Sequence, residues 1–477
     1  MYILNSHMSD RTCGAMTRKS QFAINLCQFV VLSVLLWLPP SVATAQEEVR
    51  LRAVANIAPR INLAVQPFVE TTSGGRHAAY RDSIASVFVR DLVMSGVFNV
   101  MDLSVTVRDS LGSQTSAFLN DAGEPDFELL RKLSAQALVT GEFEVRDPQI
   151  ELTMKLEDIN TRRTITTKVY AAFDLTLRRV VHRMSDDVVL QMTGDRGIAQ
   201  TRIAFMSNQT GNNELYIADY DGYDVRQVTN DKARKYSPNW SPDGSKIVYS
   251  SYRDGPHELY VLDLQTGETS KIDSYGRTTL SPRYSPDGRY IALGVVVDGS
   301  SKLYLCNADG TDLRPLVVSY GINVAPSWSP RGDQLAYVSD RTNDPHIYIV
   351  NVDGGDDHRI TFEGKYSASP SWSPRGDRIA FVAGDTLTTR RGLERMFNIY
   401  TSDTNGENLM RLTGIDGIEG NNENPNWSPD GLHVLFSSDR AEPGEDSKLF
   451  IMNWDGTGVR RVVGTAHNIT PSWGPRP

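Results

Sequence analysis

One acidic stretch of the sequence has a spacing that a divalent cation uses in other proteins. Asp219-x-Asp221-Gly222-x-Asp224 places three carboxylates around a glycine, as part of a calcium-binding loop does. The closing Glu of an EF-hand is absent, and the same turn recurs further along the chain without its acids. The stretch is therefore predicted to be a plain turn between two strands.

Between Gln46 and Gly197, the residue types that carry chemistry are scattered. His77 and His182 are isolated in the sequence, whereas a metal site needs clustered ligands. His182 lies beside the apolar stripe of a predicted helix, where we expect it to be solvated or to cap. Ser73-Gly74-Gly75 lacks the strand-to-helix junction that cradles a phosphate. No nucleophile elbow, P-loop, H-x-x-x-H or dinucleotide turn is present, so we predict no catalysis, no cofactor and no metal.

The second half of the chain repeats one phrase, which first appears as Asn239-Trp240-Ser241-Pro242-Asp243-Gly244. Its marker aromatics are spaced 44, 44, 44, 55 and 46 residues apart, and they are Trp240, Tyr284, Trp328, Trp372, Trp427 and Trp473. A period of about 40–50 residues with four short strands and tight turns is typical of a β-propeller. Six units predict six blades.

Each blade is predicted to contain four strands, which we call a to d. Pro-Asp-Gly suits a tight a–b turn because proline presets φ and glycine accepts a positive φ. The marker aromatic on strand a is expected to pack between neighbouring blades. The ring begins at Arg202–Phe205 as a strand b and ends at Pro471–Pro475 as a strand a. The two fragments are therefore predicted to complete one blade and to close the ring.

The spacing between repeats also predicts a binding face. Additional residues fall at Gly384–Asn398, Arg440–Lys448 and Gly414–Asn424, which align with b–c and d–a loops. In a four-stranded blade these two kinds of loop emerge on the same face. Because insertions in repeat proteins collect on the binding face, we predict that this face docks a partner. The alternative is that loop length drifts freely.

The first part of the chain predicts an α/β domain over residues 46–197, ahead of a propeller over 198–477. Apolar residues at helical spacing predict helices near Tyr80–Leu92 and Leu177–Met192, and Pro125-Asp126 opens a shorter one that runs through Gln136. Strands are expected at Glu48–Val54, Ile61–Phe68, Val97–Met101, Ala137–Val145, Gln149–Ile159 and Arg163–Ala171. Helices over one mixed sheet is the simplest packing.

Residues 1–45 have the pattern of a secretory signal peptide, with cleavage predicted after Ala45 and with Met16 as the expected true start. Arg18-Lys19 precede an apolar run, Phe22–Leu38, and small residues follow two prolines. The alternative is a membrane anchor, for which the run is short. The mature chain is therefore expected to have no membrane span.

Composition limits the partners of the mature chain. Removing residues 1–45 takes away three basic and one acidic residue, which changes the formal charge from −9 to −11 and argues against nucleic acid. Only Cys306 remains, so no disulfide forms within the chain, and it is expected to be a small buried residue. We expect a monomer.

Over essentially the whole mature chain, these features resemble the TolB family of the Tol–Pal system of Gram-negative envelopes. The resemblance is carried by the six repeats, the Pro-x-Trp ending, Leu92–Asn99, Asp219–Tyr223, and the junction from Met192-Thr193-Gly194 to Thr201–Phe205. It implies a periplasmic, non-enzymatic adaptor that maintains outer-membrane integrity and invagination during division. In the family, the propeller docks the peptidoglycan-associated lipoprotein Pal, and the mature N-terminal segment binds TolA.

The resemblance also implies two sets of contact residues. The TolA-type segment matches Glu48, Val49, Arg50, Leu51, Arg52, Ala53, Val54, Ala55 and Asn56, which depart from the family's usual run after Arg50. An extended segment of this kind suits strand addition to a partner's sheet edge, and the alternative is the first strand of the α/β domain. The Pal-type contacts of the d–a loops match Thr278, Ser281 and Val324.

Two other functions stay open at the level of sequence. Similar repeats accompany serine-peptidase domains, although the chain has no nucleophile elbow. A module that binds peptidoglycan or another carbohydrate through the same face is the second alternative.

Overall fold

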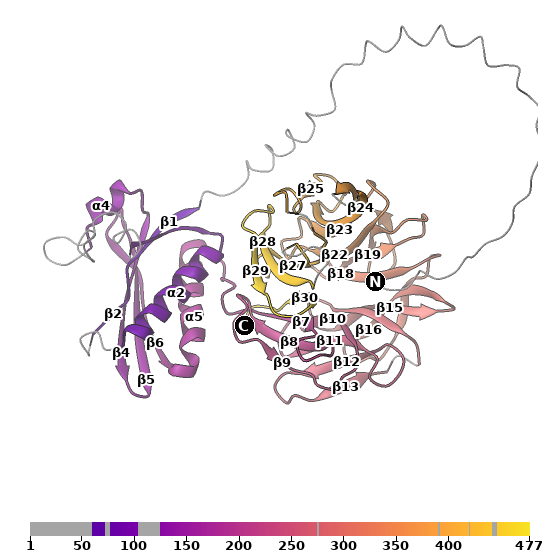
Figure 1. The fold of residues 1–477 in the computed structure, drawn as a ribbon, viewed down its shortest axis with the longest axis horizontal. Helices are drawn as coiled ribbons and strands as arrows, with labels where there is room; N and C mark the ends of the chain where they lie inside the picture. The colour runs from indigo at the N-terminus through magenta and orange to yellow at the C-terminus, as the bar shows by residue number, and fades with distance from the viewer. Residues whose placement is uncertain are drawn as a thin grey trace, which may run out of the picture. The chain divides into compact units, whose positions relative to one another are not determined.

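In a computed structural model, the described chain is Arg60–Pro477 without residues 72–76, 104–124, 274–275, 390–391, 419 and 441–445, and it belongs to one compact unit. The fold combines an α/β region with a six-bladed propeller, as predicted (Figure 1). Among the described residues, no helix has the length and apolarity to cross a membrane. The segment predicted to be a signal peptide and first strand lies outside the described residues.

The α/β region contains a mixed sheet with the order β3-β1-β4-β5-β6, and β2 pairs with β4. β1 pairs in parallel with β3 and β4, whereas β4, β5 and β6 form antiparallel hairpins. The strands are β1 (Ile61–Val65), β2 (Val69–Glu70), β3 (Phe98–Asp102), β4 (Ala137–Arg146), β5 (Gln149–Asp158) and β6 (Arg163–Phe173). The helices are α2 (Ala78–Met94), α4 (Phe127–Lys132), η3 (Asp174–Thr176) and α5 (Leu177–Thr193).

Two hydrophobic cores lie on the two faces of this sheet because successive side chains of a strand point to opposite faces. Leu63 and Val65 of β1 belong to the core beneath α2 and α5, and Ala64 between them belongs to the core beneath α4. The predicted helix from Pro125 through Gln136 is shorter than expected. It ends after Lys132 because the backbone turns to a φ of 63° at Ser134.

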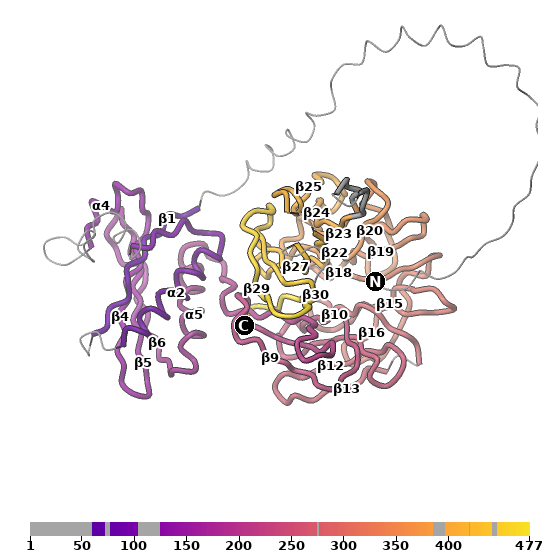
Figure 2. The backbone as a smooth tube through the Cα atoms, in the orientation of Figure 1, coloured from indigo at the N-terminus to yellow at the C-terminus, as the bar shows by residue number. Residues whose placement is uncertain are grey.

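The propeller consists of six four-stranded antiparallel sheets, which follow one another round a ring (Figure 2). Their innermost strands contact one another in the closed order β10-β14-β18-β22-β26-β30-β10. The first two blades contain β30 (Asn468–Trp473), β7 (Arg202–Ser207), β8 (Glu214–Asp219) and β9 (Arg226–Gln227), then β10 (Lys235–Trp240), β11 (Lys246–Ser251), β12 (Glu258–Asp263) and β13 (Thr269–Ile272). The third and fourth contain β14 (Thr279–Tyr284), β15 (Tyr290–Val297), β16 (Ser300–Asn307) and β17 (Arg314–Val317), then β18 (Asn323–Trp328), β19 (Gln334–Ser339), β20 (His346–Asn351) and β21 (His358–Arg359). The last two contain β22 (Ser367–Trp372), β23 (Ile379–Thr389), β24 (Gly392–Ser402) and β25 (Met410–Arg411), then β26 (Asn422–Trp427), β27 (His433–Ser438), β28 (Lys448–Asn453) and β29 (Arg460–Val463).

The two ends of the propeller sequence close the ring, as the repeat pattern predicted. β30 pairs with β7 through Ser472↔Ala204 and Trp473↔Ile203. The amide of Gly474 extends the pairing by donating to the Arg202 carbonyl at 2.7 Å. The first and last segments of the propeller therefore share one sheet, in which β30 pairs with the inner edge of β7.

The marker aromatics pack between blades, in agreement with the prediction from their size. All six have at most 9% of their surface exposed. Three of the indole nitrogens also donate across blade boundaries: Trp240 to the Ser472 carbonyl at 3.1 Å, Trp328 to the Arg283 carbonyl at 3.0 Å, and Trp427 to the Ser371 carbonyl at 3.0 Å. All six aromatics therefore position their blades by packing, and Trp240, Trp328 and Trp427 add a directed hydrogen bond to the neighbouring blade.

One insertion differs from its predicted form. Residues Gly384–Asn398 were expected to be a b–c loop, but β23 and β24 continue through most of it as a longer hairpin, paired as far as Thr389↔Gly392. Backbone groups in this insertion satisfy one another across the hairpin, which a structureless loop of the same length does not achieve. The addition still emerges at the b–c end of its blade.

Candidate docking face and central channel

The face that carries the b–c and d–a connections, which we call the loop face, exposes large apolar side chains. Successive antiparallel strands bring these two kinds of connection to the same side of the ring. Tyr320 is 89% exposed in the β17–β18 connection, and Phe362 is 65% exposed in the β21–β22 connection. The other exposed apolar residues of these connections are Tyr252, Val318, Ile322, Ile415 and Ile418.

The opposite side of the ring carries the a–b and c–d turns. In the described part of the propeller, its large exposed apolar residues are Tyr223, Val225 and Leu409. Tyr223 is itself stacked beneath the Arg178 guanidinium, whose central carbon lies 4.2 Å from the ring centroid. Exposed apolar surface is therefore concentrated on the loop face, as is typical of a surface that docks another protein.

The predicted contact residues have different positions in the structure. The TolA-type segment, Glu48–Asn56, lies outside the described residues. Thr278 is half-buried in the d–a connection before β14, where its carbonyl accepts from Val296 at 2.9 Å. Ser281 and Val324 were expected in d–a loops but lie within β14 and β18, because each of these strands begins earlier than the repeat alignment indicated. Ser281 also lines the central channel.

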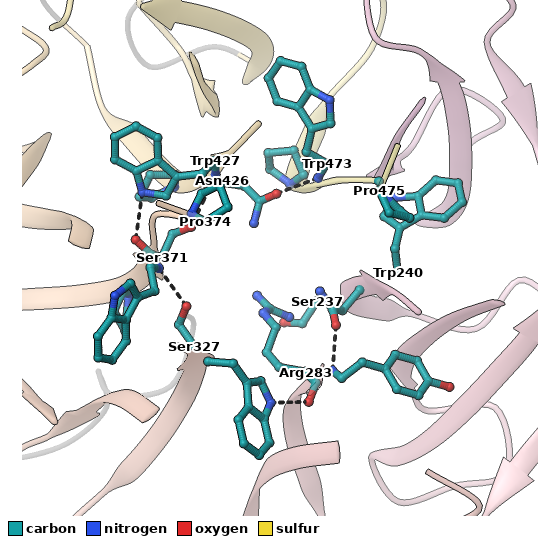
Figure 3. A pocket seen from close by; sticks show the side chains of 18 of the residues that line it. Ser237, Trp240, Arg283, Ser327, Ser371, Pro374, Asn426, Trp427, Trp473 and Pro475 are labelled. Atoms are coloured by element: carbon teal, nitrogen blue, oxygen red, sulfur yellow. Dashed lines mark hydrogen bonds between the residues drawn. The ribbon is translucent and has the colours of Figure 1, made fainter. Parts of the chain in front are cut away.

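The innermost strands surround a channel cavity of about 320 Å³ (Figure 3). Each of these strands contains a β-bulge, at which one residue has a left-handed backbone. These residues are Ser237, Ser281, Ala325, Ser369, Asn424 and Thr470, with φ between 47° and 55°. The cavity is lined mainly by small polar residues, prolines and the marker aromatics.

A hydrogen bond between blades explains why Asn or Ser precedes most marker aromatics. Asn239 Oδ1 accepts from the backbone of Tyr284 in the next blade at 2.8 Å. The equivalent acceptor Ser327 Oγ takes the amide of Trp372 at 2.9 Å, and Asn426 Oδ1 takes that of Trp473 at 2.6 Å. Short side chains with an oxygen suit this position because they reach the next blade without filling the channel. The recurring Pro-(Asn/Ser)-aromatic pattern was the available signal for this linkage, which sequence reasoning missed.

Arg283 occupies the same position in its blade, and its side chain points into the channel (Figure 3). Its Nη1 donates to the carbonyl of the neighbouring Pro282 at 2.9 Å. Burial lowers the pKa of the Arg283 guanidinium to about 10. A guanidinium donates only, so it cannot replace the acceptor found in the other blades.

A buried polar network joins α2 and α5 to the turn that follows β8. Asp91 accepts hydrogen bonds from His182 Nδ1 at 2.8 Å and from the Tyr220 hydroxyl at 2.7 Å. Burial and the Asp91 carboxylate raise the pKa of Tyr220. Burial favours neutral His182, but Asp91 outweighs it and the pKa of His182 is raised. The expectation that His182 is solvated or caps a helix is wrong, because this helix face packs against the propeller.

The same network contains a set of side chains that resembles a metal site. Ligand atoms of Asp91, His182 and Asp221 lie within 4.8 Å of one another. However, Asp221 pairs with Arg178, and Arg90 Nη1 lies 3.6 Å from the same carboxylate. These two cations already compensate its charge, so the donor set does not fit a metal ion.

Three further sequence expectations can be compared with the structure. The Asp219–Asp224 stretch forms a c–d turn, as predicted, in which the Gly222 amide donates to the Asp219 carbonyl at 2.9 Å. His77 is not isolated, because its Nδ1 lies 2.7 Å from Glu70 Oε1. Cys306 is buried as expected, and burial raises the pKa of its thiol to about 12, which keeps it unreactive.

Family models match both parts of the chain. The TolB amino-terminal domain matches residues 49–165, and the TolB beta propeller domain matches residues 189–397. Both domains occur in the order that the sequence resemblance implied.

Related sequences carry the same description. The chain is 36% identical over 228 residues to a Tol-Pal system protein TolB of Syntrophotalea carbinolica, which covers 46% of this chain and 49% of the relative. It is 34% identical over 201 residues to that of Geobacter sulfurreducens, covering 42% of this chain and 44% of the relative. The matched stretches thus span about half the length of these relatives.

A solved structure extends the likeness in fold to nearly the whole chain. The crystal structure of TolB from Acinetobacter baumannii superposes with a TM-score of 0.71 at 23% identity, covering 88% of this chain and 98% of the other. At this identity the match concerns the fold, which is an α/β domain followed by a six-bladed propeller.

Proposed function

The chain belongs to the TolB family, whose two domains it carries in order, and we propose that it is a periplasmic, non-enzymatic scaffold of a Tol–Pal envelope system. In this proposal, the loop face docks the periplasmic domain of a Pal-like lipoprotein. Residues 48–56 bind a TolA-like inner-membrane protein. The assembly maintains the outer membrane and its invagination during cell division.

The exposed apolar residues of the loop face are the observation that carries the docking proposal. Tyr320 and Phe362 come from the d–a connections of neighbouring blades, so one folded partner can cover both. Aromatic side chains of this kind supply much of the binding energy at protein interfaces. The lipoprotein is the favoured occupant because the family resemblance assigns it to the propeller.

The N-terminal contact rests on sequence. Residues 48–56 alternate in polarity at their start and lie ahead of the first described strand. A strand offered to the edge of a partner's sheet gains main-chain hydrogen bonds and needs few specific side chains. Export to the periplasm follows from the signal sequence, with removal after Ala45 as part of the proposal.

Binding of the chain without residues 1–45 to the purified periplasmic domain of the cognate Pal-like lipoprotein tests the docking face. The double change Tyr320→Ser and Phe362→Ser is expected to weaken binding about tenfold or more, because each removes an exposed aromatic anchor. Leu409→Ser, on the c–d side of the ring, is the matched control and should bind as the unchanged chain does. Equal affinity for all three proteins would exclude this face.

A second experiment separates the scaffold from the two alternatives. Isolated peptidoglycan sacculi should retain the chain only when the lipoprotein is also present. Retention without the lipoprotein would favour a carbohydrate-binding module. Turnover of peptidase or esterase substrates by the purified chain would contradict a non-enzymatic role.

A further inference from the structure

Arg283 departs from a rule that the other innermost strands follow. At this position the blades otherwise carry short polar residues, which are Asn239, Ser327, Ser371, Asn426 and Ser472. Four of them accept the amide of the next marker aromatic. Arg283 replaces such an acceptor with a cation, so the amide of Trp328 gains no equivalent side-chain acceptor there. A residue that departs from a repeated pattern and gains no stabilising contact by doing so is typical of a functional position.

The charge of Arg283 has no acidic neighbour in the cavity. Among the described residues that line the cavity, Arg283 is the one with a charged side chain. The single acidic residue of the innermost strands, Glu423, precedes the part of β26 that lines the cavity. Burial is also the sole cause behind the lowered pKa of Arg283, with no contribution from a carboxylate.

Two other arginines of the propeller that are withdrawn from solvent have such a partner. Arg341 Nη1 lies 2.5 Å from Asp357, and the almost fully buried Arg440 lies 2.8 Å from Asp416. A guanidinium held away from bulk water without a counter-charge is unfavourable. The arrangement around Arg283 therefore lacks the carboxylate that Arg341 and Arg440 each contact.

The surroundings of Arg283 are suited to a small anion. Three residues with hydroxyl groups, Ser237, Ser281 and Ser369, line the same cavity. A guanidinium donates two parallel hydrogen bonds to a carboxylate or phosphate, and hydroxyl groups can donate to the remaining oxygens. A cavity of about 320 Å³ accommodates one such group with its water.

We propose that the propeller channel is an oxyanion-binding site in which the Arg283 guanidinium binds one carboxylate or phosphate-type group. The group comes either from a free small anion or from an acidic side chain that enters the channel. This inference rests on the channel and not on the loop face, so it stands or fails independently of the docking proposal.

Isothermal titration calorimetry on the chain without residues 1–45 tests the site. The probes are inorganic phosphate, acetate and the capped peptide acetyl-Gly-Glu-Gly-amide, at constant ionic strength in a chloride buffer. The unchanged chain should bind at least one probe saturably, and Arg283→Gln should weaken that binding about tenfold or more. Arg289→Gln is the control, since Arg289 lies on the same blade, is largely exposed and pairs with Asp287.

The probes distinguish the two sources. Arg283-dependent binding of phosphate or acetate supports a free anion, and Arg283-dependent binding of the peptide alone supports an entering side chain. The proposal is overturned if no probe binds saturably, or if Arg283→Gln binds as the unchanged chain does. Arg283→Asn guards against misfolding, because it restores the acceptor found in two other blades, and it should lose anion binding while keeping the thermal midpoint.

Discussion

Deleting Pro471–Pro477 should unfold the propeller and not merely shorten it. The deletion removes Trp473, whose side chain is 7% exposed, together with the end of β30 that pairs with β7. Losing a buried tryptophan costs about 3–5 kcal/mol. Four hydrogen bonds are lost as well, at about 1 kcal/mol each. They are Trp473 N to Asn426 Oδ1, Trp473 Nε1 to Thr201 Oγ1, Gly474 N to the Arg202 carbonyl, and Trp240 Nε1 to the Ser472 carbonyl.

The sum, about 7–9 kcal/mol, is comparable to the whole stability of a typical folded domain, which is about 5–15 kcal/mol. Differential scanning calorimetry of a chain that ends at Thr470 should therefore show loss of the main transition or a large fall in its midpoint. A chain that ends at Pro475 is the control, because it keeps the paired part of β30. An unchanged midpoint for the chain that ends at Thr470 would refute the view that the terminal strand closes the ring.

Two further predictions concern buried polar groups. Asp91→Asn should lower the free energy of unfolding by about 1–3 kcal/mol, since His182 and Tyr220 bind different carboxylate oxygens and the change turns one of these acceptors into an NH2 donor. Urea unfolding measures this loss, and Asp82→Asn on the exposed side of α2 is the control. Equal losses in both variants would contradict the reasoning. His257 is 5% exposed, and burial lowers its pKa below the usual 6.5. As the pH falls, the unfolded chain therefore binds a proton at this histidine before the folded chain does. The free energy of unfolding is expected to decrease as the pH drops below about 6.5. His257→Phe should therefore lose less stability than the unchanged chain between pH 7.5 and 5.5 in urea unfolding, and parallel curves would exclude a contribution from His257.

The features that the sequence predicted correctly are those encoded by local, repeated chemistry. Proline and glycine at fixed positions specify the a–b turns, and the spacing of the aromatics specifies six blades. Closure of the ring could be predicted because Arg202–Phe205 and the Pro471–Pro475 ending are complementary fragments of one repeat unit. These signals are periodic, so each copy supports the others.

The features that were missed depend on residues that are distant in sequence. Asp91, His182 and Tyr220 come from two helices and a turn, and no spacing rule relates them. The hairpin at Gly384–Asn398 was missed because its added residues lack the turn chemistry of the regular repeats. Arg283 was visible as the one cation in the Pro-x-aromatic series, but its meaning depends on the channel into which it points.

Pairing of β30 with β7 has a consequence for the order of assembly. β7 is made early and its partner last, so the first blade lacks its inner strand while five further blades are being synthesised. During that time β7 exposes unsatisfied backbone groups, which invite pairing with a strand of another molecule. A chain that stalls before its final residues is therefore expected to be prone to swapping strands between copies, whereas release of the finished chain removes that hazard in a single event.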